Sequence, residues 1–92
     1  MIVNICGIPH RVTEKEDYFD ADTHLGIIDY SKAEITINST MPEVLKKETL
    51  CHEMTHGILV HIGRNDLAND ETFVQTLGNA IFHGFEVKTT EG

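Results

Sequence analysis

The chain has 92 residues, a length that predicts one domain over residues 1–92 with a thin hydrophobic core. Its 40% of hydrophobic residues is enough for a globular core and its 24% of charged residues is ordinary, so we do not expect disorder throughout the chain. The formal net charge of −8, with seven scattered Lys and Arg residues, argues against binding to a nucleic-acid backbone.

Cysteine use and hydropathy indicate the compartment. Cys6 and Cys51 are far apart in the sequence and form no CxxC pair. Residues 1–8 lack the basic start and the long apolar run of a secretory signal. No apolar stretch approaches the roughly 20 residues that span a bilayer. We therefore expect a cytoplasmic protein with reduced thiols and no membrane partner.

The N-terminal half is predicted to form four short strands, from its apolar runs, its polar–apolar alternation and its Gly and Pro residues. The first turn is expected at residues 7–9. His10 follows in this turn region, where we expect it to be exposed. An acidic loop is predicted over residues 15–24. The predicted strands cover residues 2–6, 10–14, 25–30 and Glu34–Asn38.

Two helices are predicted to follow. A proline in the first turn and Gly63 after the last turn predict a helix over residues 42–62. A second helix is predicted to start near Asp66 or Asn69, either of which can cap it, and to end at Gly84. The order of elements predicts an α+β fold, in which a small N-terminal antiparallel β-sheet packs on two helices.

The predicted first helix carries the motif His52-Glu53-Met54-Thr55-His56. Four residues correspond to about 40° of helical rotation, so His52 and His56 leave the same face one turn apart and can bind one Zn²⁺. Glu53 is displaced by about 100° from His52. This angle makes Glu53 a poor third ligand but a good general base for a metal-activated water. The alternative is a pair of hydrogen-bonded core histidines without a metal.

A catalytic zinc site needs three protein ligands and one open position, so a third ligand must come from elsewhere. Three candidates remain open from the residues alone. Asp70 lies nearer the centre of the apolar stripe of the second helix, and the helical count slightly favours it. Glu71 has the longer reach. His61 lies about 180° from His52 on a continuous helix, and can act as a ligand only if the helix breaks before it.

Residues 49–59 (TLCHEMTHGIL) and the segment Asp70-Glu71-Thr72-Phe73-Val74 carry a resemblance to a known family. They resemble small zinc metallopeptidases, many of them encoded by phages and bacterial mobile elements, and also the minigluzincins, pared-down relatives of thermolysin. The resemblance covers about residues 34–81. It implies a zincin-like minimal core and a zinc-dependent metallopeptidase, in which Zn²⁺ is bound by His52, His56 and Glu71 and Glu53 is the general base. It also implies that a peptide or protein substrate pairs with Glu34–Asn38 as an antiparallel edge strand above the zinc.

The sequence departs from larger gluzincins because it shows no downstream domain to wall the substrate cleft. It also shows no assignable residue for stabilising the oxyanion, since each candidate donor is equally a surface or packing residue. A non-catalytic zinc-binding adaptor or inhibitor that retains the helix pair is therefore the alternative function. The candidate oxyanion donors are Tyr18, Tyr30, His24 and His83.

Overall fold

The computed structural model describes residues 1–16 and 25–84, which form an α+β fold and confirm the predicted fold class. The predicted acidic loop, and with it Tyr18 and His24, falls almost entirely outside these residues. The described part has three helices rather than two, because the connector forms a short helix of its own. None of the three is long and apolar enough to cross a bilayer. The elements are β1 (Ile2–Ile5), β2 (Ile8–Lys15), β3 (Gly26–Asp29), β4 (Glu34–Asn38), α1 (Glu43–His61), α2 (Asn65–Ala68) and α3 (Glu71–Gly84).

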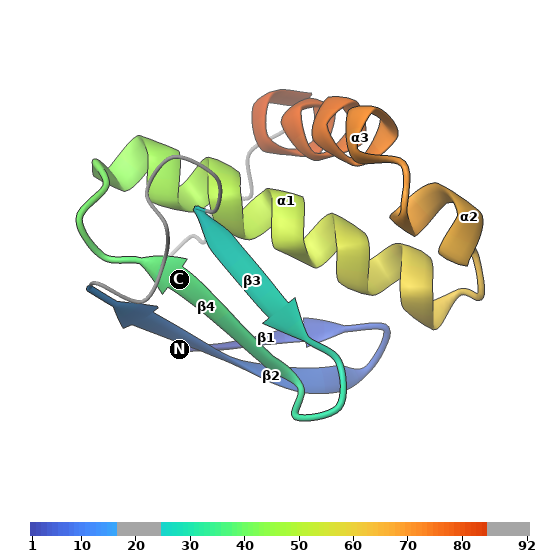
Figure 1. The fold of residues 1–92 in the computed structure, drawn as a ribbon, viewed down its shortest axis with the longest axis horizontal. Coiled ribbons are helices and arrows are strands. Elements are labelled where there is room, and N and C mark those ends of the chain that lie inside the picture. Colours follow the sequence, from blue (N-terminus) through green and yellow to red (C-terminus); the bar gives the residue numbers. More distant parts are fainter. Residues whose placement is uncertain (17–24, 85–92) are drawn as a thin grey trace, which may run out of the picture.

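The four strands form one sheet in the order β1-β2-β4-β3 (Figure 1). The β1–β2 and β3–β4 pairs are antiparallel, but β2 and β4 are parallel, with Val12 opposite Ile35. The sheet is therefore mixed, and the prediction of an antiparallel sheet was wrong in this respect. Glu34–Asn38 pairs on both sides, so the prediction that it is an edge strand was also wrong. The strand next to β4 at the edge of the sheet is β3.

The hairpin between β1 and β2 turns at Cys6 and Gly7, whose φ angles are 51° and 81°. Two successive positive φ angles are typical of a two-residue type I′ turn, whose twist matches that of the strands. The turn thus comes earlier than predicted, and β2 already begins at Ile8. His10 consequently faces the core and is 0% exposed, so the prediction that it is exposed was wrong.

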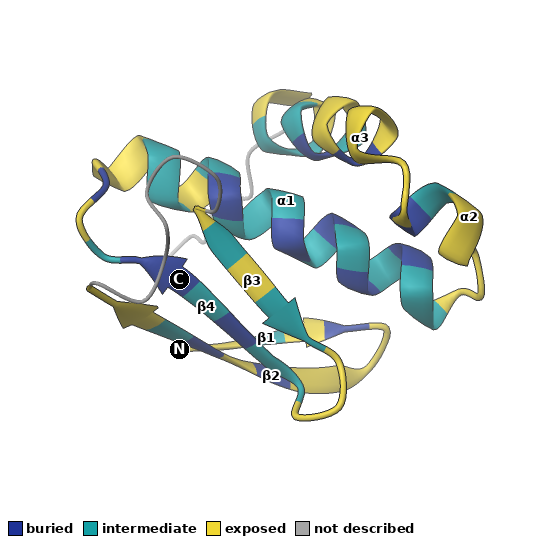
Figure 2. Cartoon of the chain, in the orientation of Figure 1, coloured by how far each residue is buried: buried dark blue, intermediate teal, exposed yellow. Residues whose placement is uncertain are grey.

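Helix α1 packs on one face of the sheet, and α3 packs on the side of α1 that faces away from the sheet (Figure 1). Among the described elements, α3 contacts α1 and α2 but no strand. Helix α1 is therefore covered on two sides, and buried residues recur along most of its length (Figure 2). These residues are Thr49, Glu53, Thr55, Gly57 and Leu59.

Two apolar clusters hold the layers together. The larger one lies between the sheet and α1, and the smaller one joins α1 to α2 and α3. Burial of each Val, Leu, Ile or Met side chain contributes about 1.5–3 kcal/mol, so apolar contacts stabilise both interfaces of α1. The buried members are Ile5, Val12, Ile35, Ile37 and Met41 in the larger cluster, and Leu59, Ala68 and Val74 in the smaller.

Candidate metal centre

The two sides of α1 carry different parts of the predicted motif. A Cβ atom at Gly78 of α3 would lie 3.3 Å from the Cα atom of His52, so the histidine side of α1 meets α3. A Cβ atom at Gly26 of β3 would lie 3.3 Å from Cγ of Glu53, so the glutamate side meets the sheet. The 100° step between consecutive helical residues thus places His52 and Glu53 against different layers.

Glu71, the first residue of α3, lies between the two histidines. Its Oε2 atom is 3.2 Å from Nε2 of His52, and its Oε1 atom is 3.0 Å from Nε2 of His56. One ligand atom from each of the three side chains can be chosen so that all lie within 4.8 Å of one another. The structure therefore brings together the three residues that the family resemblance implied as ligands.

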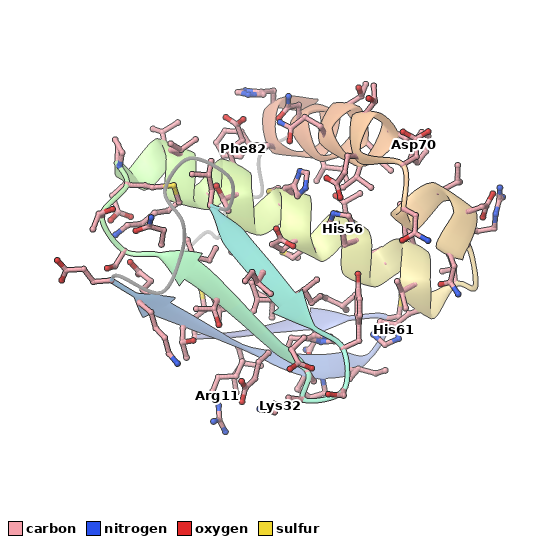
Figure 3. The ribbon with its side chains drawn as sticks, viewed as in Figure 1. Arg11, Lys32, His56, His61, Asp70 and Phe82 are labelled. Carbon is pink, nitrogen blue, oxygen red and sulfur yellow. The ribbon has the colours of Figure 1, made fainter. Side chains whose placement is uncertain are left out.

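The two other candidates for the third ligand lie elsewhere. Asp70 accepts a hydrogen bond from the backbone N–H of Phe73 at 3.0 Å, and so caps the start of α3. His61 lies in the last turn of α1 and packs edge-to-face against His10, with ring centroids 5.6 Å apart. Figure 3 shows His56 on the side of α1 that faces α3, with Asp70 at the start of α3 and His61 at the far end of α1.

Neighbouring groups orient both imidazole rings. Nδ1 of His52 donates a hydrogen bond of 2.7 Å to Oε1 of Gln75, and the Gln75 amide nitrogen donates in turn to Asn79 at 3.1 Å. His56 forms a backbone hydrogen bond with Ala68. Such outer partners fix the tautomer and the ring orientation of metal-binding histidines. Gln75 was not predicted from the sequence, although its position four residues after Glu71 puts it on the same helical face.

The three side chains fit a zinc ion. Bonds of about 2.0–2.1 Å in a tetrahedral site place neighbouring ligand atoms about 3.3 Å apart. Each histidine Nε2 atom lies near this spacing from a different oxygen of Glu71, at 3.2 Å for His52 and 3.0 Å for His56. Burial lowers the pKa of His56, which favours the neutral ring that a metal requires. Glu71 adds a negative charge, and its side chain is 69% exposed. Three ligands with an exposed side leave room for a fourth position.

A cleft of about 710 Å³ lies beside the cluster, between β3, α1 and α3. His52, His56 and Glu71 line it from the helices, and Gly26 to Ile28 line it from the edge strand. Glu53 also lines it, although its side chain is largely covered, with the residue only 7% exposed. The candidate ligands and the candidate base therefore share one cleft.

The carboxyl group of Glu53 has a raised pKa. Burial is the main reason that the pKa of Glu53 is raised to about 7; His52 opposes this rise, and the negative charge of Glu71 adds to it. A general base works best when its pKa is close to the working pH, because it must both accept and return a proton. The Glu53 carboxyl is suited to that role near neutral pH.

The two cysteines and the candidate oxyanion donors differ in their position relative to the cleft. Cys6 and Cys51 are both free thiols. Burial and the nearby Glu48 raise the pKa of Cys51, which disfavours the thiolate that a metal would need. His83 is exposed near the end of α3, where its ring packs on Phe82, and it does not line the cleft. Of the four candidate oxyanion donors, two lie outside the described residues, and Tyr30 lines the cleft.

Comparison with known proteins does not assign a family. No protein-family model matches the chain, and no solved structure matches it. A protein of Staphylococcus epidermidis described as a "Putative 2-hydroxyacid dehydrogenase" is 27% identical over 81 residues. The match covers 83% of this chain but 26% of that protein, so the chain spans about a quarter of its length. The chain contains no GxGxxG motif of the kind that binds dinucleotides.

Proposed function

We propose that the protein is a zinc-dependent metallopeptidase. The proposal rests on one observation: Nε2 of His52 and Nε2 of His56 converge on the Glu71 carboxylate, beside the buried carboxyl of Glu53 in the same cleft. A purely structural zinc site needs ligands but no general base, so the position of Glu53 favours an enzyme. His52, His56 and Glu71 would hold the ion.

Bound zinc supplies a Lewis acid that polarises the scissile carbonyl and makes water more acidic. Glu53 takes a proton from the attacking water as the water oxygen bonds to the carbonyl carbon. The π-electron pair of the carbonyl moves onto its oxygen. When the C–N bond breaks, that pair re-forms the carbonyl and Glu53 returns its proton to the leaving nitrogen. Water is thereby added across the peptide bond, and Glu53 regains its starting state.

We place the peptide substrate along β3 rather than along β4. Within the described residues β3 pairs with β4 on one side and has no strand on its other side, so that edge offers free backbone groups. Gly26, Ile27 and Ile28 line the same cleft as Glu53. An extended peptide that adds to this edge would lie directly beside the candidate base.

The first test is metal content. Protein purified without chelator is expected to contain one zinc per chain by elemental analysis, and the His56→Ala variant is expected to lose it. Folded wild-type protein without metal, which also takes up none from added zinc, would contradict the proposal.

The second test concerns catalysis. Glu53→Gln keeps the size of the side chain but removes the base, so it should retain zinc and lose about 10²–10⁴-fold in peptide cleavage. Glu43→Gln, on the exposed first turn of α1, is the matched control and should cleave like the wild type. A mixed peptide library read by mass spectrometry is the assay. Equal cleavage by wild type and Glu53→Gln would indicate a contaminating protease. No cleavage by either protein, with zinc in both, would favour the non-catalytic adaptor or inhibitor.

A further inference from the structure

Tyr30 lies directly after Asp29, the last residue of β3, and lines the same cleft as the candidate ligands and base. The turn that follows is held by Asp29, whose Oδ1 atom accepts hydrogen bonds from Ser31 Oγ at 2.7 Å and from the Lys32 backbone N–H at 3.2 Å. The strand on one side and this hydrogen-bonded turn on the other fix the backbone of Tyr30. Its ring therefore belongs to the cleft wall rather than to a loose loop.

The hydroxyl group of Tyr30 is available as a donor. No hydrogen bond engages it within the part of the chain that the structure describes. Burial raises the pKa of Tyr30, and the negative charges of Glu53 and Glu71 raise it further. The hydroxyl therefore keeps its proton at neutral pH and lies within electrostatic range of both carboxylates.

The other side-chain donors that line the cleft are committed or covered. The Gln75 amide group is engaged by His52 and Asn79. The imidazoles of His52 and His56 face Glu71. Thr49 is 6% exposed and lies under β3. Among the described residues that line the cleft, Tyr30 thus carries an exposed donor with no other partner.

We propose that Tyr30 is a catalytic residue, whose hydroxyl donates a hydrogen bond to the carbonyl oxygen of the scissile peptide as negative charge develops there. This inference rests on the proposed peptidase function. A donor aimed at the developing oxyanion acts mainly in the transition state, so its loss lowers kcat more than it changes KM. The turn after the edge strand in this way supplies a group that has no other source in the described cleft.

The test compares two probes on zinc-loaded wild type and Tyr30→Phe by isothermal titration calorimetry. N-phosphoryl-Leu-Phe carries a tetrahedral phosphoryl group that imitates the oxyanion. Acetyl-Leu hydroxamate is a planar metal chelator with no such group. Tyr30→Phe keeps the ring and removes the hydroxyl alone. We expect it to bind the phosphoryl peptide about 10–100-fold more weakly than wild type, and to bind the hydroxamate and zinc equally well.

The possible outcomes distinguish a failure of the Tyr30 proposal from a failure of the proposed peptidase function. Equal binding of the phosphoryl peptide by both proteins, with normal hydroxamate binding, would overturn the role of Tyr30 and leave the zinc site standing. Weaker binding of both probes by Tyr30→Phe would also overturn it, because the hydroxyl would then matter for the cleft structure in general. Failure of wild type to bind zinc or either probe would instead refute the proposed function. With any cleaved peptide, a lower kcat at unchanged KM supports the proposal, and a higher KM at unchanged kcat contradicts it.

Discussion

Because the carboxyl of Glu53 is buried, we predict that the metal-free protein loses stability to unfolding as the pH rises. Its pKa is about 7 in the folded chain and 4.5 in a solvated reference. The folded state therefore binds this proton more tightly than the unfolded state. The contribution of Glu53 to the free energy of unfolding is fully present below pH 4.5 and is lost as the pH rises through 7. At about 1.4 kcal/mol per pH unit, the loss has an upper bound of about 3 kcal/mol in the free energy of unfolding.

Glu53→Gln cannot ionise and should escape this loss. In urea titrations with EDTA, followed by circular dichroism, the variant should match the wild type in stability near pH 4.5. It should exceed the wild type by about 1–3 kcal/mol at pH 8.5. The difference between the two proteins cancels the titration of all other groups that behave alike in both. Glu43→Gln, whose parent side chain is 79% exposed, is the control and should not gain stability over the wild type at pH 8.5. A difference between Glu53→Gln and the wild type that does not change with pH would refute the reasoning.

Four further outcomes follow from the site. Glu71→Ala should abolish stoichiometric zinc binding in equilibrium dialysis, whereas Asp70→Ala should keep it and lose about 1 kcal/mol of stability in a urea melt from the missing helix cap. His61→Ala should also retain zinc in the same dialysis, and binding lost there but kept in Glu71→Ala would reverse the ligand assignment. Gln75→Ala should weaken zinc binding about 10–100-fold in a competition assay with a chelating dye, because it releases the His52 ring. Removing zinc with EDTA should lower the melting temperature by several degrees in scanning calorimetry, since the ion binds the folded state.

The local part of the site could be predicted because it depends on helical geometry alone. The four-residue spacing of His52 and His56 and the one-residue step to Glu53 follow from 3.6 residues per turn, wherever the helix lies in the fold. The choice between Asp70 and Glu71 could not be made this way. It depends on α3 starting at Glu71, which leaves Asp70 outside the helix as its cap, so a helical count that includes Asp70 does not apply.

The sheet order depends on contacts that no local pattern contains. The parallel pairing of β2 with β4 joins segments more than 20 residues apart, and it turns Glu34–Asn38 from an edge strand into an interior one. Alternation within that strand is the same in either position.

The burial of His10 was missed for a simpler reason. The glycine and proline near it favoured a turn at residues 7–9, whereas the positive φ of Cys6 moves the turn closer to the start of the chain.

The close approach of α3 to α1 at Gly78 bears on the spacing of the candidate metal centre. Gly78 lies seven residues after Glu71, two helical turns along the same face, and it packs against the backbone of His52. The separation of the two helices is therefore set there by backbone contact. A methyl group at position 78 would lie 3.3 Å from the Cα atom of His52, so the two helices would have to move apart by a few tenths of an ångström to accept it. A residue that contributes no ligand atom thus limits how closely the helix that carries Glu71 approaches the helix that carries the two histidines.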